Sequence, residues 1–452
     1  MECCQDQSQQ EPKTKLTMAD ILRAGGAEYR REYGHTLTVE QDRTLREVPG
    51  CRTPLFGGHV HKCKDCGHKV RLYNSCHNRS CPQCGGNQRQ RWHNGRLEEM
   101  LPVEYYHAVF TLPDEIAQLA AANKRVLYNI LFIAVREGTA KTAREWSVFQ
   151  ARLGFTSMLH SWGQTLNFRP HIHALIPCGG LSCETGRWVD MPPGFFLPRQ
   201  KMADDFRDTF LALLQKSYDK DELNLVGKLR HLACPERFAT WMAELASITW
   251  ITYAGSLSDG DDLQSTEAME RTVGYLARYA CRVAISNERL ISMENGVVRF
   301  YYKDYRENRG RGPRKVKELP TVEFIQRFLT HVMPHRMQSS RPNGFLGNKY
   351  RTECLAAIRE QLGDRVPEEI HSEDAPEDDP FDEECSDTED ASEEKRCPQC
   401  EQGRMEILQE LRRPTVNEIY TARWQDLLSP EFTIDESDVS EELALSSALE
   451  FW

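Results

Sequence analysis

The chain has 452 residues, of which 40% are hydrophobic, so it can build several cores, and two to four domains are expected at roughly 100–200 residues each. No apolar run approaches the roughly 18 residues that span a bilayer, and the polar start lacks a hydrophobic signal core. A cytoplasmic protein without a membrane partner is therefore expected, and a membrane or secreted protein is not. Sixteen cysteines in such a chain indicate metal binding more than disulfides.

The net charge of −11 conceals an asymmetry. Residues 351–452 carry 9 Lys and Arg against 30 Asp and Glu, a net of −21, which leaves +10 on residues 1–350. A basic body can collect phosphates. The acidic tail is interpreted as a solvated, disordered extension, and the alternative is that it competes for the basic surface.

Both helices and strands are predicted along the chain. Residues 16–50 have helical spacing of apolar side chains, and residues 51–95 are rich in Cys, His and Arg, so that a metal must supply much of their order. The predicted strands are 105–113, 151–162, 171–180, 248–255 and 297–306. The predicted helices are 125–138, 203–217, 236–247, 268–285 and 322–333. Gly179-Gly180 is predicted as a turn.

Strands and helices without strict alternation predict an α+β fold. The expected domains are a helical segment at 1–50, a zinc-binding domain at 51–100, a larger domain at 101–352, a disordered acidic linker at 353–396, and a tail at 397–452. The tail contains half of a zinc knuckle.

Two Cys-x2-Cys knuckles are the strongest metal signal. Cys63 with Cys66 and Cys81 with Cys84 are separated by 14 residues, and four thiolates form a closed tetrahedral zinc site, which is structural. Nearby residues that could replace one ligand are Cys51, His59, His61, Cys76 and His77. Cys397-x2-Cys400 resembles half of a second ribbon, but no second pair accompanies it, so a second zinc is not favoured.

Basic side chains surround these knuckles. Arg79, Arg89 and Arg91 are candidates to contact a DNA backbone. The alternative, a merely solvated basic face, is about as compatible with the sequence.

A His-x-His triplet lies in a predicted strand. Alternation places His171 and His173 on one face with Leu175, and Ile172, Ala174 and Ile176 on the other. Two imidazoles on one side of a rigid strand can bind Mg²⁺ or Mn²⁺ and leave positions open for phosphate oxygens. A third ligand is needed, and Gln164 is preferred over His160. The alternative is that both histidines are structural.

A tyrosine pair occurs in the predicted helix 268–285. Tyr275 and Tyr279 are four residues apart, so their Cβ atoms would lie about 5–6 Å apart and both hydroxyls could serve one site. Three arginines near their face could hold phosphates: Arg271, Arg278 and Arg282. The alternative is two amphipathic tyrosines at the edge of a core. Tyr301 and Tyr305 have the same spacing in a predicted strand, where they would be about 13 Å apart.

These stretches together resemble a known family, the bacterial transposases of the insertion-sequence-91 type, which are HUH (histidine–hydrophobic–histidine) tyrosine nucleases. The resemblance covers most of the chain, from about residue 16 to residue 352. The matching stretches are CRTPLFGGHVHKC, YNSCHNRSCPQC, LPVEYYHAVFTLP, LHSWGQTLNFRPHIHALIPCGGLS, YLARYACRVAISNERL, YYKDYR, FIQRFLTHVMPHRM and NGFLGNKYR.

The resemblance implies an N-terminal zinc-binding domain and an HUH nuclease domain at 101–352 with a central, mainly antiparallel sheet flanked by helices. The family's two histidines map onto His171 and His173, and its tyrosines onto Tyr275 and Tyr279. Some relatives keep one tyrosine.

The expected function is therefore a rolling-circle-type transposase that cleaves and rejoins single-stranded DNA at element ends and target. Structural Zn and catalytic Mg or Mn are the expected cofactors. Two alternatives remain open: a plasmid replication initiator or relaxase with the same chemistry, and a non-catalytic zinc-ribbon DNA-binding protein.

Overall fold

A computed structural model describes residues 15–84, 86–192, 196–256, 274, 283–304, 313–363 and 396–415. The chain forms two compact units that are not contiguous in sequence. The first unit consists of Met1–Cys84, Ile285–Leu329 and Ala391–Trp452, and the second of Gly85–Ala284 and Thr330–Asp390. Residues 285–329, which the sequence placed within the larger domain, therefore belong with the zinc-binding segment.

Three helices build the core of the first unit. Helices α1 (Met18–Tyr33) and α2 (Val39–Glu47) each begin with a capping box, in which a threonine side chain accepts from the third helical residue. Helix α9 (Thr321–Thr330) packs against α1 so closely that a Cβ on Gly25 would lie 2.5 Å from Thr321 Cγ2. The predicted helices at 16–50 and 322–333 are thus confirmed, with α9 ending near residue 330.

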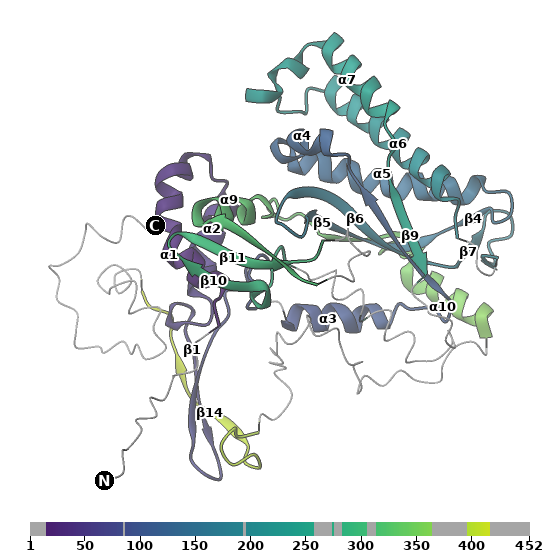
Figure 1. The fold of residues 1–452 in the computed structure, drawn as a ribbon. Helices are drawn as coiled ribbons and strands as arrows, with labels where there is room; N and C mark the ends of the chain where they lie inside the picture. Colours follow the sequence, from purple (N-terminus) through teal and green to yellow (C-terminus); the bar gives the residue numbers. More distant parts are fainter. Residues whose placement is uncertain are drawn as a thin grey trace, which may run out of the picture. The chain divides into compact units, whose positions relative to one another are not determined.

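Two three-stranded antiparallel sheets complete the first unit. One has the order β10-β11-β12, built from β10 (Leu290–Glu294), β11 (Val297–Tyr302) and β12 (Lys315–Pro320). The other has the order β14-β1-β2, built from β1 (Gly58–Cys63), β2 (Lys69–Tyr73) and β14 (Met405–Leu411). The second sheet therefore joins a hairpin from the start of the chain to a strand more than 300 residues later (Figure 1).

The second unit is organised around a five-stranded antiparallel sheet with the order β13-β5-β6-β3-β9. Its strands are β3 (Tyr105–Thr111), β5 (Gly154–Trp162), β6 (Phe168–Pro177), β9 (Thr252–Ser256) and β13 (Ser340–Gly344). A small sheet, β4-β7-β8, consists of β4 (Ala151–Arg152), β7 (Gly179–Ser182) and β8 (Trp188–Asp190). This mixture of helices and antiparallel sheet is the predicted α+β fold.

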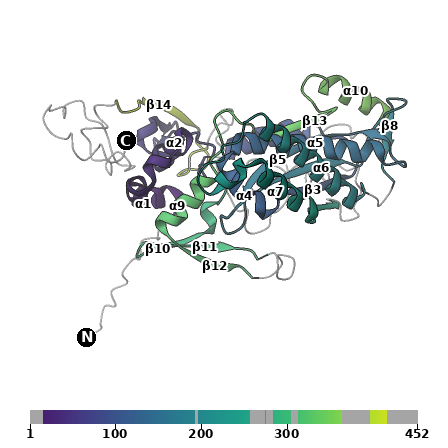
Figure 2. The same ribbon diagram turned by 90° about the horizontal axis from the view of Figure 1, so that it is seen from above.

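Helices cover both faces of the five-stranded sheet. Their bounds are α3 (Gly86–Leu97), α4 (Ala117–Ala122), α5 (Lys124–Glu145), α6 (Arg199–Asp219), α7 (Pro235–Ser247) and α10 (Arg351–Leu362). Helices α5 and α6 lie along one face (Figures 1 and 2), and α3 lies on the opposite side of the sheet (Figure 1). A Cβ on Gly138 of α5 would lie 2.9 Å from the Phe206 backbone, so this glycine allows the close packing of α5 against α6.

The two faces of this sheet differ in chemistry. Ile172, Ala174 and Ile176 of β6 are buried in the main core with the residues of α5 and α6. Leu175 belongs to a smaller cluster on the other face, together with Leu97 at the end of α3. The predicted alternation along β6 is confirmed, and it places His171 and His173 on the face away from α5 and α6.

One local prediction is wrong. Gly179 and Gly180 do not form a turn but lie in β7 and pair with β8. A Cβ on Gly179 would lie 2.1 Å from the Trp188 ring, and one on Gly180 would lie 2.8 Å from the Arg152 carbonyl oxygen. Here glycine serves close strand packing and not chain reversal.

The predicted helix 268–285 lies almost entirely outside the described residues. None of the helices that the structure does describe has the length and apolar character needed to cross a bilayer.

Candidate functional site

Three histidines converge on the face of the large sheet that lies opposite α5 and α6. His171 and His173 come from β6, and His160 comes from β5, directly opposite His171 in the antiparallel register. Their ring nitrogens lie within 4.8 Å of one another. His160 and His173 are buried, with 4% and 7% of their surface exposed, whereas His171 is half-buried. The cluster is therefore rigid on its inner side and accessible through His171.

The ring orientations leave two nitrogens facing each other. His171 Nδ1 lies 2.8 Å from the Arg169 carbonyl oxygen, which can only accept, so the Nδ1–H donates and Nε2 carries the lone pair. The two Nε2 atoms of His171 and His173 are 3.1 Å apart. Two imidazole nitrogens bound to one divalent ion at about 2.1 Å lie ~3.0–3.4 Å apart. The donor set thus fits a divalent cation.

A fourth histidine, His107 of β3, supports the cluster from the inside. Its Nε2 lies 2.7 Å from His173 Nδ1, and the ring is 6% exposed. Burial, and then the nearby His171, lower the pKa of His107 to about 4, so the ring is neutral at physiological pH. If a cation occupies Nε2 of His173, then His173 must donate from Nδ1 to His107, which fixes the tautomer and orientation of the ligand.

The third ligand stays a prediction, with Gln164 and His160 as its two candidates. The structure groups His160 with His171 and His173, while Gln164 lies in the β5–β6 turn. A register shift after His160 and the stacking of its ring on Trp162 at 4.5 Å fix the His160 side chain on this face. The sequence alone did not supply the strand pairing that places His160 opposite His171. The same applies to His107, which occupies one position within an otherwise apolar strand.

The candidate nucleophiles and their arginines are outside the described residues. These are Tyr275, Tyr279, Arg271, Arg278 and Arg282. Their positions relative to the histidines stay a prediction.

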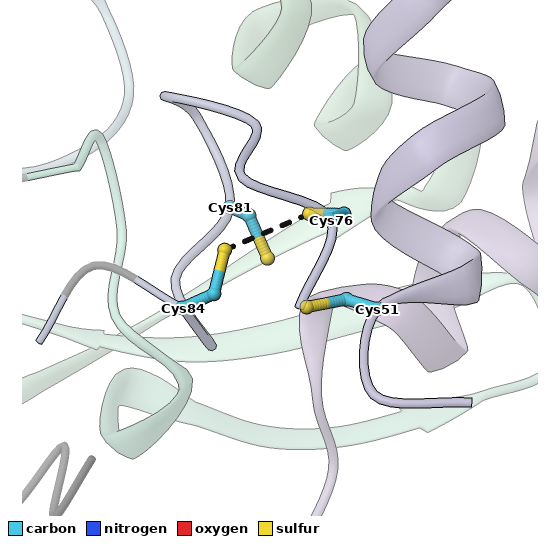
Figure 3. A group of neighbouring side chains, drawn as sticks. All are labelled: Cys51, Cys76, Cys81 and Cys84. Atoms are coloured by element: carbon cyan, nitrogen blue, oxygen red, sulfur yellow. Dashed lines mark hydrogen bonds between the residues drawn. The ribbon is translucent and has the colours of Figure 1, made fainter. Parts of the chain in front are cut away.

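The first unit contains a cluster of four cysteines, Cys51, Cys76, Cys81 and Cys84 (Figure 3). Their sulfur atoms lie within 4.8 Å of one another, and Cys76 Sγ is 3.6 Å from Cys84 Sγ. Four thiolates around zinc, with Zn–S near 2.3 Å, have sulfurs about 3.8 Å apart. Hydrogen bonds, the largest from Cys51, lower the pKa of the Cys84 thiol, so a thiolate is favoured there. The cluster fits a closed structural zinc site.

This grouping corrects the predicted ligand set. Cys63 and Cys66 do not join Cys81 and Cys84 but lie with Cys397 and Cys400. The reason is the β1–β2 hairpin, which carries the first knuckle on its turn, whereas the segment after β2 carries Cys76 to meet Cys51. Two of the residues named as possible substitutes, Cys51 and Cys76, therefore complete the second knuckle.

Of the three arginines proposed for DNA contact, the structure describes the side chain of one. Arg79 is exposed in the loop between Cys76 and Cys81. Arg89 and Arg91 lie on α3, in a part whose side chains the structure does not describe.

Comparison with known families matches two parts of the chain. A family model described as "Putative transposase" matches residues 154–353, which include the three clustered histidines. A second, described as "Transposase zinc-binding domain" of the insertion-sequence-91 type, matches residues 21–112, which include Cys51, Cys76, Cys81 and Cys84. The zinc-binding description and the cysteine geometry together support structural zinc in the first unit.

Two curated proteins and one solved structure are similar to the chain. "Putative transposase y4qJ" of Sinorhizobium fredii is 38% identical over 394 residues, which cover 86% of this chain and 94% of that protein. "Transposase for insertion sequence element IS801" of Pseudomonas savastanoi pv. phaseolicola is 26% identical, covering 72% and 74%. The conjugative relaxase TrwC in complex with mutant OriT DNA is 13% identical and covers 58% and 95%; its TM-score of 0.20 supports no conclusion. The chain therefore belongs to the transposases of the insertion-sequence-91 type.

Proposed function

We propose that this transposase cleaves and rejoins single-stranded DNA at the ends of its element by tyrosine transesterification. One observation carries the proposal: His160, His171 and His173 converge on one point of a rigid sheet, with two Nε2 atoms 3.1 Å apart. A divalent cation bound there, Mg²⁺ or Mn²⁺, would polarise the scissile phosphate. The family match over this sheet, and the printed name of the relative that serves an insertion sequence, support an element as the substrate.

The chain's own residues would supply the nucleophile. Tyr275 attacks phosphorus through its phenolic oxygen, so that a Tyr–O–P bond forms and the P–O3′ bond breaks. The phenol loses its proton, and the departing 3′ oxygen gains one. A phenol has a pKa near 10, so a neighbouring cation is needed to favour its ionised form. The product is a 5′-phosphotyrosine and a free 3′-hydroxyl.

Exchange of one phosphoester for another conserves the energy of the bond. Rejoining therefore needs no ATP, since the reverse attack by a 3′-hydroxyl releases the tyrosine. Tyr279 would cleave the second site or the target strand. Arg271, Arg278 and Arg282 would hold the DNA phosphates near the tyrosines, because guanidinium groups bind phosphate oxygens in pairs.

Basic side chains would supply further contacts to the DNA backbone. We propose this role for Arg79, which is exposed in the first unit, and for Arg89 and Arg91 of α3 in the second unit. Such contacts position the strand but carry no sequence information.

A covalent-adduct assay tests this function. Purified protein is mixed with labelled single-stranded DNA from the flanks of its gene, with Mg²⁺ or Mn²⁺, and run on a denaturing gel. A shifted band is expected from the wild type and from the control Tyr301→Phe, Tyr305→Phe, which has the same spacing of tyrosines. The band should disappear in Tyr275→Phe, Tyr279→Phe. If protein that still binds the DNA forms no adduct with either metal, the result would contradict the proposed nuclease and favour a zinc-dependent DNA-binding protein.

A further inference from the structure

A second group of four cysteines joins the two ends of the chain. Cys63 and Cys66 lie at the turn of the β1–β2 hairpin, and Cys397 and Cys400 precede β14. All four sulfur atoms lie within 4.8 Å of one another. Cys63 Sγ is 3.7 Å from Cys400 Sγ, and Cys66 Sγ is 3.6 Å from Cys397 Sγ. These distances match the ~3.8 Å edge of a zinc tetrathiolate.

The two halves of this group have similar, though not identical, backbone hydrogen bonds. In the first knuckle the Cys63 N–H donates to the His68 carbonyl at 2.8 Å, and in the second the Cys397 N–H donates to the Gly403 carbonyl at 2.7 Å. A backbone N–H also donates to the leading sulfur of each knuckle, from Cys66 to Cys63 and from Gln399 to Cys397. Two such turns that direct four thiolates at one point are typical of a zinc ribbon.

The backbone around the group leaves no room for larger residues. A Cβ on Gly403 would lie 2.3 Å from Cys63 Sγ and 3.0 Å from Cys400 Sγ. Gly57 has a φ of +67°, and a Cβ there would lie 2.5 Å from the Leu411 carbonyl oxygen. The N-terminal hairpin is therefore shaped to receive the C-terminal strand along its length.

Strand β14 gains little from apolar burial. Ile407 and Leu408 are 60% and 52% exposed, although β14 pairs with β1 from Gly58 to Cys63. An ion pair between Lys64 and Glu406 links the two segments, but both side chains are more than half exposed, so it contributes little to stability. Closing a loop of more than 300 residues has an entropic cost, and a metal ion bound by both ends would offset it.

We propose that Cys63, Cys66, Cys397 and Cys400 bind a second structural zinc ion, which anchors the C-terminal segment to the N-terminal hairpin. Cys397 and Cys400 lie outside both matched family regions, 21–112 and 154–353. The full chain then holds two zinc ions in its first unit, and the second of them requires residues from both ends of the sequence.

Zinc content of the full-length protein tests the stoichiometry. Elemental analysis of the purified wild type should give two zinc ions per chain, and Cys397→Ser, Cys400→Ser should give one. The matched control Cys183→Ser, Cys234→Ser changes two cysteines outside both clusters and should keep two. Two zinc ions in the Cys397, Cys400 variant would overturn the proposal.

Alkylation of the wild type tests the ligands without any substitution. The zinc-loaded chain is treated with iodoacetamide and mapped by mass spectrometry, before and after a chelator. Cys397 and Cys400 should be protected at first and become reactive with the chelator, whereas the exposed Cys183 should react in both states. Reaction of Cys397 and Cys400 as fast as Cys183 in the zinc-loaded protein would contradict the proposal, even if the variant fails to fold.

A glycine substitution gives a graded version of the same test. Gly403→Ala places a methyl group against two of the four sulfurs and should lower the affinity of one zinc ion at least tenfold, measured by competition with a chromogenic chelator. Gly34→Ala, which has open space around its Cβ in the same unit, should leave both affinities unchanged. Equal affinities in the two variants would contradict the proposed site.

Discussion

The histidine cluster and the cysteine clusters occupy opposite kinds of environment. The histidines lie on a five-stranded sheet whose other face is buried under α5 and α6, so this unit has a core that does not depend on a metal. The cysteines lie in hairpins and turns whose strands are short and half-exposed. The metal that we propose on the sheet would therefore add chemistry to a finished fold, whereas zinc in the first unit contributes to folding itself.

Removal of the zinc site formed by Cys51, Cys76, Cys81 and Cys84 should have the largest effect, which is on the folding of the first unit. Structural zinc binding is worth on the order of 10 kcal/mol in small zinc domains, and Cys81→Ser, Cys84→Ser removes two of four thiolates. We expect loss of one zinc ion and loss of amide protection against hydrogen exchange in β1, β2 and the adjacent loops. Protection in β5 and β6 should persist. Equal loss in β5 and β6 would contradict the contrast between the two units.

Removal of His173 should have the opposite consequence, because it should weaken metal binding on the sheet without unfolding either unit. His173→Ala deletes a proposed ligand and removes the contact between His173 Nδ1 and His107 Nε2, which costs about 1–3 kcal/mol. We expect Mn²⁺ binding, followed by electron paramagnetic resonance, to weaken by at least a hundredfold, while the sheet stays folded and the zinc content is unchanged.

The control for that prediction is the other His-x-His triplet. His59→Ala, His61→Ala changes two histidines of β1 in the first unit and should leave Mn²⁺ binding at the wild-type level. If it weakens Mn²⁺ binding as much as His173→Ala does, the site has been assigned to the wrong triplet.

Substitution of His107, which contacts His173, should lower Mn²⁺ affinity by a smaller factor. His107→Phe keeps the ring volume but removes the acceptor for His173 Nδ1, and loss of such a partner lowers metal affinity about 10–100-fold. His107→Asn restores an acceptor and should recover part of the affinity. A positioning role is supported only if the Asn variant binds Mn²⁺ more tightly than the Phe variant.

The smallest expected effect is a pH dependence carried by His331. Burial lowers its pKa to about 3, and the neutral ring accepts from Ser161 Oγ and donates to the Leu166 carbonyl. The unfolded chain binds the proton at higher pH than the folded one, so this contribution is complete above about pH 6.5 and is lost as pH falls toward 3.

Between pH 7 and pH 5 this loss is about 2 kcal/mol. This loss of stability is measured by hydrogen exchange of the β5 and β6 amides at increasing urea concentrations. The urea concentration at the midpoint of unfolding should fall as the pH is lowered. His331→Gln should be less stable at pH 7 but should show a shallower slope between pH 7 and pH 5. An unchanged slope would assign the pH dependence to other groups.

The sequence predicted those features that depend on short-range pattern. Alternation in β6 placed His171 and His173 on one face, and the apolar density of residues 105–113 predicted β3. The features that it missed depend on pairing between distant segments. The Cys-x2-Cys spacing identifies a knuckle but not its partner, which is set by β14 pairing with β1. His160 and His107 likewise join the cluster through strand register.

Under the proposed function, the histidine cluster holds a metal against the phosphate that a tyrosine attacks. This claim is tested most directly by replacing one non-bridging oxygen of the scissile phosphate with sulfur, at the junction mapped by the adduct assay. Mg²⁺ binds sulfur poorly, and softer ions such as Mn²⁺ or Cd²⁺ bind it better. For one of the two diastereomers, we predict an adduct yield in Mg²⁺ that falls at least tenfold and recovers with Mn²⁺ or Cd²⁺. Equal yields from the sulfur and oxygen substrates in Mg²⁺, for both diastereomers, would contradict a metal–phosphate contact at this site.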